Sequence, residues 1–143
     1  MALPDTVKHE AASSRTSGIS AQAVTTGANF LGSEIDNSVN KDLFLDFEFV
    51  FTSSVSPAAG KSVEVYLIYA VDGTNYDDGA VGTDPLGNPI AMISLPEDTS
   101  AHQTSRHQIQ LTPYKFKILV KSESDQTVTI TIDARTHNVE VVD

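Results

Sequence analysis

The feature that most constrains this chain is a run in which apolar residues occupy every second position between residues 43 and 51. In "KDLFLDFEFVFTS" the polar residues Asp46, Glu48 and Thr52 lie between apolar positions, which are Leu43, Leu45, Phe47, Phe49 and Phe51. Successive side chains of a β-strand point to opposite faces of a sheet, so this spacing predicts a strand with one buried face. Phe44 and Val50 make the other face partly apolar, and we expect a neighbouring segment or subunit to cover it in places.

A second alternating run, "SVEVYLIYAV", follows the turn residues "SPAAGK". Its odd positions, Val63, Val65, Leu67 and Tyr69, alternate with Glu64, Tyr66 and Ile68. The two runs and the turn between them predict an antiparallel hairpin. Shorter runs rich in β-branched or aromatic residues predict further strands, and these are "PIAMISL", "HQIQL", "YKFKILVK", "QTVTITID" and, as an edge strand, "NVEVV".

The fold class follows from these runs and from the absence of a helical pattern. No long window carries apolar residues at helical spacing with caps, so little helix is expected. Six or more short strands predict an all-β protein, an antiparallel β-sandwich with a jelly roll or a small barrel as alternatives. A length of 143 residues suits one domain, predicted over residues 18–143. Residues 1–17 are predicted to form an extended N-terminal arm. One strand is predicted after it, at Ile19–Thr25.

Charge and composition exclude several classes of function. The chain has 9 basic and 19 acidic residues and a formal net charge of -10, which disfavours binding to nucleic acid or to anionic membranes. No stretch approaches the ~20 apolar residues of a membrane-spanning helix. The absence of cysteine removes disulfides, thiolate nucleophiles and cysteine-ligated zinc. The N-terminus lacks the features of a secretory signal, so we expect synthesis in a cytoplasm.

The stretch "YAVDGTNYDDG" carries enough oxygen ligands to raise the question of calcium. An EF-hand loop places acids at positions 1, 3 and 5 before a glycine, and neither Gly73 nor Gly79 fits that pattern. An irregular site remains an alternative, built from Asp72, Asn75, Asp77, Asp78 and Asp84. The favoured interpretation is a polar excursion of turns between residues 72 and 89, with no metal or other cofactor.

Asp46 and Glu48 are the strongest candidates for catalytic carboxylates. They share one face of the predicted strand at a separation of about 6.8 Å, which resembles the spacing used in glycoside hydrolysis. The chain has no Trp and only four Tyr to line a sugar cleft, so a solvated or subunit-facing strand is favoured and no enzyme is predicted. The four histidines are His9, His102, His107 and His137, and they lack zinc-ligand spacing. His102 and His107, five residues apart in "AHQTSRHQ", are predicted to lie in a loop that enters a strand.

Two blocks of the sequence resemble a known group of proteins. The first is "LGSEIDNSVNKDLFLDFEFVFTSSVSPAAGKSVEVYLIYAVDGTNYDDG" and the second is "TPYKFKILVKSESDQTVT". Between Leu31 and Thr129 the chain resembles small virion proteins of tailed bacteriophages. The resemblance implies a β-sandwich that sits on the outer surface of the phage head as a decoration or cement protein.

The same resemblance implies a set of partners. The major capsid protein is the expected partner, and self-association around a local symmetry axis, most simply as a homotrimer, is expected as well. The apolar residues Leu3, Val7 and Ile19 are candidate capsid-binding anchors of the arm. The alternative is a tail or fibre module in which the excursion around Tyr76 recognises a host-surface glycan.

Overall fold

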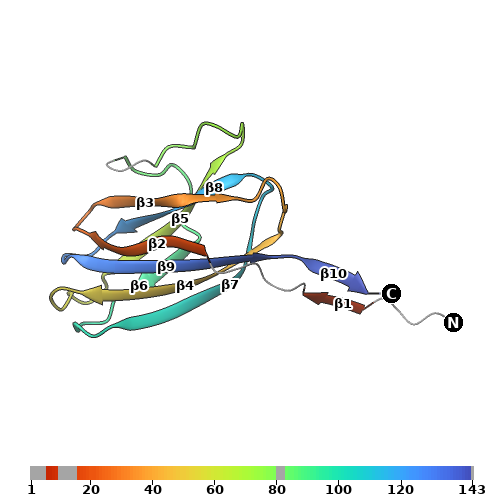
Figure 1. Ribbon diagram of the computed structural model, residues 1–143. Coiled ribbons are helices and arrows are strands. Elements are labelled where there is room, and N and C mark those ends of the chain that lie inside the picture. The colour runs from red at the N-terminus through yellow and green to blue at the C-terminus, as the bar shows by residue number, and fades with distance from the viewer. Residues whose placement is uncertain (1–5, 10–15, 80–82, 143) are drawn as a thin grey trace.

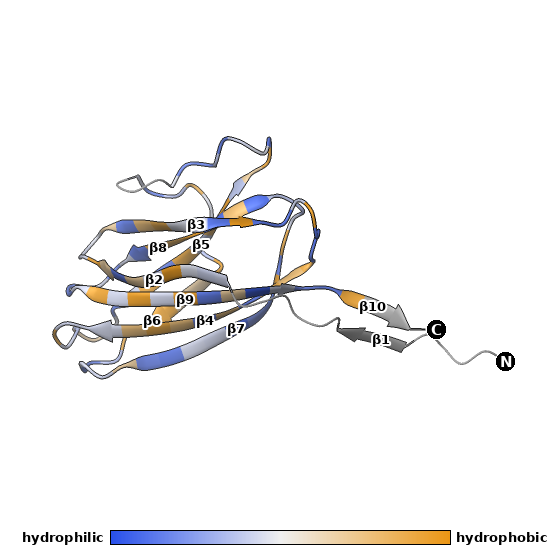
Figure 2. Ribbon diagram, in the orientation of Figure 1, coloured by the Kyte–Doolittle hydropathy of each residue, from blue (hydrophilic) through white to orange (hydrophobic). Residues whose placement is uncertain are grey.

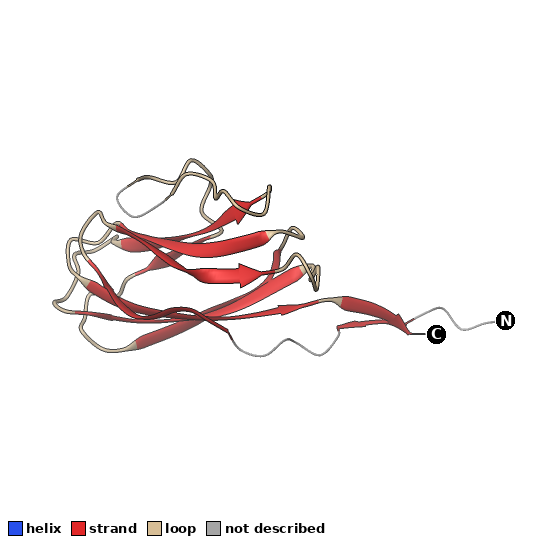
Figure 3. Cartoon of the chain, turned by 45° about the horizontal axis from the view of Figure 1, so that its top comes forward, coloured by secondary structure: helices blue, strands red, loops and turns tan. Residues whose placement is uncertain are grey.

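The computed structural model describes residues 6–9, 16–79 and 83–142. Within these ranges the chain forms strands and no helix (Figure 3). The strands are β1 (Thr6–His9), β2 (Thr16–Val24), β3 (Asn29–Asp36), β4 (Phe44–Ser53), β5 (Ser62–Ala70), β6 (Ala91–Ser94), β7 (His102–Gln110), β8 (Lys115–Ser122), β9 (Val128–His137) and β10 (Val139–Val142). The predictions of an all-β fold and of low helix content are confirmed.

Eight of the strands form two four-stranded antiparallel sheets that pack face to face (Figure 1). The first, the β4 sheet, has the order β2-β9-β4-β7, and the second, the β5 sheet, has the order β3-β8-β5-β6. The arrangement is a sandwich and not a closed barrel. β1 and β10 pair with each other in a separate two-stranded sheet, which we call the ribbon.

The pairing order is nested along the chain. β5 pairs with β6, β4 with β7, β3 with β8, β2 with β9 and β1 with β10. The chain is therefore one long antiparallel double ribbon rolled into two sheets, which is the jelly-roll arrangement. The ribbon of β1 and β10 is the outermost pair of this series.

The predicted hairpin between the first two runs is wrong. β4 lies between β9 and β7 in one sheet, whereas β5 lies between β8 and β6 in the other. Both strands carry a strongly apolar face, and these two faces pack into the one core between the sheets. The turn residues 54–61 therefore connect two sheets instead of two neighbouring strands.

The core lies between the sheets and follows the alternation of the sequence. β4 alternates between buried and partly exposed residues along its whole length, and Figure 2 shows the corresponding hydrophobic and hydrophilic bands on β9. Leu43 is the exception among the predicted core positions, because the strand begins after it and its side chain is 47% exposed. The largest fully buried side chains include Leu45, Phe49, Phe116, Ile118, Ile130 and Ile132.

The end of the predicted arm overlaps β2. β2 begins at Thr16 and pairs with β9, so two residues of the predicted arm belong to the β4 sheet. β2 includes all but the last residue of the strand expected at Ile19–Thr25, and β3 is a strand that the sequence did not indicate. Figures 1 and 3 show the ribbon standing clear of the sandwich at the end where β9 continues into β10.

Candidate functional site

The segment between β5 and β6, residues 71–90, lies over the outer face of the β5 sheet and is called the β5–β6 loop. That face is not polar, because Tyr66, Ile68 and Leu119 are buried there in a small cluster of their own. Leu31 and Tyr76 pack against this cluster, so the loop supplies part of its cover. The loop therefore replaces the second layer that an apolar outer face requires.

Tyr76 fastens the loop to the sheet. Its hydroxyl donates a hydrogen bond to the carboxylate of Glu34 on β3, and Lys117 Nζ lies 4.4 Å from the centre of its ring. The hydrogen bond from Tyr76, followed by the interaction with Lys115 Nζ at 3.2 Å, lowers the pKa of Glu34. Burial, followed by the bond to Glu34, raises the pKa of Tyr76 to about 12.

Replacing Tyr76 with phenylalanine is expected to change the alkaline titration of the protein. Burial and then the bond to Glu64 also raise the pKa of Tyr66 to about 12, so two phenols of the folded chain should ionise about two pH units above a free tyrosine. The stabilisation from each neutral phenol is complete below pH 10 and is lost as the pH rises through 12. Phenolate absorbance should show one fewer late transition in Y76F; an unchanged count would contradict the assignment.

Two of the four acidic residues of the loop, Asp72 and Asp84, have local partners. Asp72 Oδ1 accepts hydrogen bonds from the backbone N–H of Thr74 at 2.8 Å and of Asn75 at 2.7 Å, and the Asn75 amide donates to Asp72 Oδ2. Asp84 forms an ion pair with Lys121 at 3.3 Å. Among the residues that the structure describes, no group of His, Asp or Glu has the arrangement of a metal site. The alternative of an irregular calcium site therefore gains no support.

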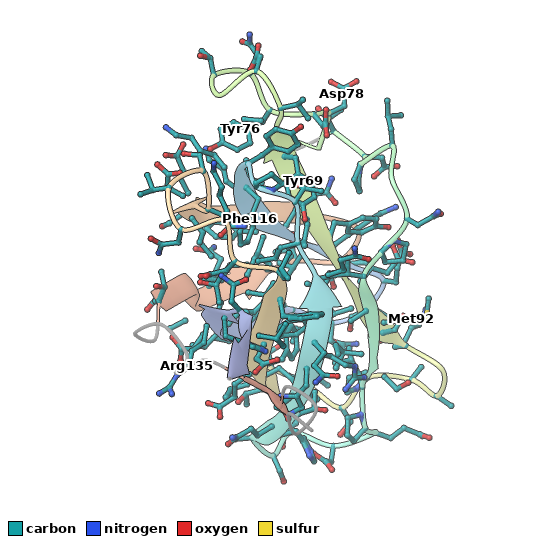
Figure 4. The ribbon with its side chains drawn as sticks, turned by 90° about the vertical axis from the view of Figure 1, so that its right-hand side faces the viewer. Tyr69, Tyr76, Asp78, Met92, Phe116 and Arg135 are labelled. Carbon is teal, nitrogen blue, oxygen red and sulfur yellow. The ribbon has the colours of Figure 1, made fainter. Side chains whose placement is uncertain are left out.

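A groove of about 570 Å³ lies between the loop and β5. Its floor is formed by three consecutive residues of β5, and its walls come from two parts of the loop. Asp77 and Asp78 are exposed, and Leu86 is 84% exposed. Figure 4 shows Tyr76 and Asp78 in the loop, beyond Tyr69 at the end of β5. The lining residues are Tyr66, Leu67, Ile68, Tyr76, Asp77, Asp78, Leu86, Gly87 and Asn88.

The candidate carboxylates Asp46 and Glu48 do lie on one face of β4, as predicted. Asp46 Oδ1 accepts a hydrogen bond from the backbone N–H of Gln108 at 2.8 Å, at a bulge where Gln108 has a φ of 56°. Glu48 accepts a hydrogen bond from the Gln103 side chain at 2.7 Å. Asp46 thus holds the bulge of β7 in place, and it lines a hollow of about 300 Å³ together with Glu48, Ser105 and His107.

Three of the histidines have described surroundings, and two of these, His107 and His137, lie beside the Asp46 carboxylate, with ring nitrogens 3.7 and 3.6 Å from its oxygens. His102 Nε2 lies 2.7 Å from Asp98, and this interaction is the first cause of the lowered pKa of Asp98. His107 is exposed and lies 3.7 Å from Asp46. His137 is buried, because it ends β9 and stacks on Phe44 with ring centroids 5.5 Å apart. The prediction that His102 and His107 lie in a loop is wrong, because both belong to β7.

The base of the ribbon is held by the side-chain amides of Asn37, which is buried, and Asn138, which is half-buried, and sequence reasoning missed both. The Asn37 side chain donates to the carbonyls of Asp42 and Thr112 and accepts from the N–H of Asp42, all at 2.9 Å. Asn138, the one residue between β9 and β10, accepts from the N–H of Leu43 at 2.9 Å. An asparagine between polar residues of a turn gives no sequence signal for such a role.

The three predicted capsid-binding anchors are not brought together. Leu3 lies outside the described residues, and Val7 belongs to β1, where it pairs in register with Val141. Ile19 is 2% exposed and lies in the core between the sheets, so its side chain is not available to a partner. The expectation for Ile19 is corrected, because the apolar position that looked like an arm anchor is an inward-facing residue of β2.

The fold and these sites define an acidic jelly-roll sandwich with a protruding terminal ribbon and a loop-covered outer face. No helix among the described residues is long and apolar enough to cross a membrane. No family model matches the chain, and no curated protein matches it.

Proposed function

We propose that this chain is a structural virion protein that decorates and stabilises a phage head by binding major capsid protein on the outer surface. The observation that supports this most is the ribbon, which stands clear of the sandwich in both views (Figures 1 and 3). An isolated pair of strands is only marginally stable in water, so a protruding ribbon is best explained by a surface on which it rests. Both of its outer strand edges are suited to pairing with another chain.

The electrostatics and the class of fold agree with this proposal. A net charge of -10 keeps the protein away from packaged DNA, and a chain without cysteine needs no oxidising compartment. Jelly rolls recur in viral capsid proteins, although they also occur in lectins, so the fold alone does not choose between these classes. Symmetric display of many copies, which we propose are trimers, makes weak individual contacts durable.

The glycan-binding alternative gains less from the structure. Its central residue, Tyr76, has its hydroxyl bonded to Glu34 and its ring beneath Lys117, so both its polar and its aromatic groups are already engaged. Tyr66, the other aromatic residue of the groove, is buried. A sugar site would instead require an aromatic face open to the ligand.

Removing residues 1–15 tests the role of the ribbon, because it deletes β1 and leaves β2 whole. We expect the shortened chain to keep its thermal unfolding transition and to bind expanded, undecorated heads about tenfold more weakly or worse, as measured by co-sedimentation. The full chain, added to the same heads in parallel, is the control. Equal binding by the two chains would show that β1 is not the capsid contact, and no binding by either would contradict the proposal.

A further inference from the structure

The edge of β5 that faces β6 carries a backbone position that no described residue fills. Along this edge the carbonyls of Lys61, Val65 and Tyr69 accept hydrogen bonds from the N–H groups of Leu95 at 2.9 Å, Ile90 at 2.8 Å and Asp77 at 3.0 Å. Successive backbone groups of a strand alternate between its two edges, so Leu67 presents its N–H and C=O on the same edge. No described residue forms a hydrogen bond with Leu67 there.

The local sequence explains why this position is open. β6 pairs with β5 only over Ser62–Val65. Pro89 comes directly before Ile90, whose N–H bonds to Val65, and proline has no N–H with which to continue the ladder toward Leu67. The chain then leaves the sheet edge through residues 86–88, which form one wall of the groove. Leu67 is part of the groove floor, so the open backbone position lies where an extended segment has room to enter.

The groove also has a definite chemical character. Asp77 and Asp78 are exposed on one wall, and neither carboxylate forms an ion pair with a described residue. Leu86 contributes an exposed apolar surface on the other wall. These features suit a short extended segment that combines a cationic residue with an apolar or β-branched neighbour, and that adds one strand to the β5 sheet beside β6.

We propose that this groove binds the β1 segment, Thr6–His9, of a second copy of the chain. The segment "TVKH" forms a strand, contains Lys8 beside Val7, and has no acidic residue. Among the described strands β1 pairs with β10 alone, which leaves its other edge for β5 of the second copy. The groove therefore accepts a strand whose charge complements its own.

The segment that fills the groove must come from another molecule. Figures 1 and 3 show the ribbon and the β5–β6 loop on different sides of the sandwich. Asn138 alone separates β9 from β10, and its side chain also donates to Asp42 Oδ1 at 3.2 Å, so the ribbon has little freedom to turn back. The contact joins unlike surfaces, and such contacts close into rings when the rotation between copies allows it.

This inference rests on the self-association included in the proposed function, and its test uses no phage heads. In sedimentation equilibrium of the full chain, Lys8→Glu and Asp78→Lys should each raise the dissociation constant about fivefold or more, since each places like charges together. The charge-swapped double variant should recover the original value. Glu97→Lys, which makes the same charge change at an exposed position outside the groove, should not weaken association by this repulsion.

Hydrogen exchange gives an independent readout of the strand contact. The Leu67 amide should exchange more slowly as the concentration of the full chain rises, and the dependence should disappear in D78K but remain in E97K. A chain that stays monomeric, an equal effect of D78K and E97K, or a Leu67 exchange rate independent of concentration would each overturn the inference. Binding to heads is measured separately, so failure here leaves the capsid contact standing, and the converse also holds.

Discussion

Replacing Gly32 with alanine is expected to destabilise the sandwich by about 4 kcal/mol, the largest effect of any substitution considered for this protein. β2 and β3 belong to different sheets and meet at the closed flank of the sandwich. A Cβ added at Gly32 would lie 2.2 Å from the carbonyl oxygen of Gly18 and 2.9 Å from Ile19 Cγ1. The first of these is backbone within a paired strand, so the two sheet edges must separate to make room.

The measurement is the free energy of unfolding from denaturant titration, and the chain provides its own control. Gly87→Ala makes the same chemical change at a position where an added Cβ meets nothing within 4 Å. Its unfolding free energy should stay within about 0.5 kcal/mol of the parent. If G32A and G87A unfold at the same denaturant concentration, the close approach of β2 and β3 is not present in solution.

The sequence predicted a strand correctly where one face of the strand is buried and the other is exposed to solvent. The alternation at residues 45–51 predicted β4 correctly, because a sandwich core forces its strands into a two-residue period. β3 gave no such signal, since its stretch "NFLGSEID" places Gly32 and Ser33 where alternation would show. The glycine that hides the strand from pattern analysis is the residue that lets it approach β2.

Pairing was harder to predict than strands, because the same alternation fits a neighbour in the sheet and a partner across the core. The runs that form β4 and β5 are consecutive, and a turn lies between them, yet they face each other from different sheets. Only the nested order of all the strands distinguishes these arrangements, and that order depends on contacts between the two halves of the chain. The groove at Leu67 could not be predicted from the sequence for the same reason, since the open edge of β5 depends on where its partner strand β6 ends.

In the candidate site, too, the features that depend on neighbouring residues were predicted, and those that depend on contacts between distant residues were not. The polar stretch after β5 was predicted to turn with Asp72 in a turn position, and local hydrogen bonds account for this. The engagement of Tyr76 with Glu34 joins residues 42 positions apart and has no local signal. Ile19 was misassigned to a binding role because its apolar side chain lies in a weakly patterned segment, whereas pairing of β2 with β9 places it in the core.

The second large effect is expected at Asn37, whose replacement with alanine should lower the free energy of unfolding by about 3 kcal/mol or more. The side chain is 2% exposed and satisfies the N–H and C=O of Asp42 and the C=O of Thr112. Alanine leaves these backbone groups without their partner in a place that water reaches poorly. The cost of leaving buried polar groups unsatisfied exceeds the net gain from the original hydrogen bonds.

Asn40→Ala is the matched control, because Asn40 lies three positions away in the same connection and is exposed. It should unfold within about 0.5 kcal/mol of the parent. Asn37 also affects the base of the ribbon. The Asp42 backbone donates one hydrogen bond to the Asn37 side chain and accepts another from it, and the Asp42 carboxylate accepts a hydrogen bond from the amide of Asn138, which immediately precedes β10. In N37A, hydrogen exchange at Asp42 and Leu43 should therefore rise more than exchange in the centre of β4. Uniform acceleration along β4 would show that Asn37 supports the whole sheet and not the base of the ribbon in particular.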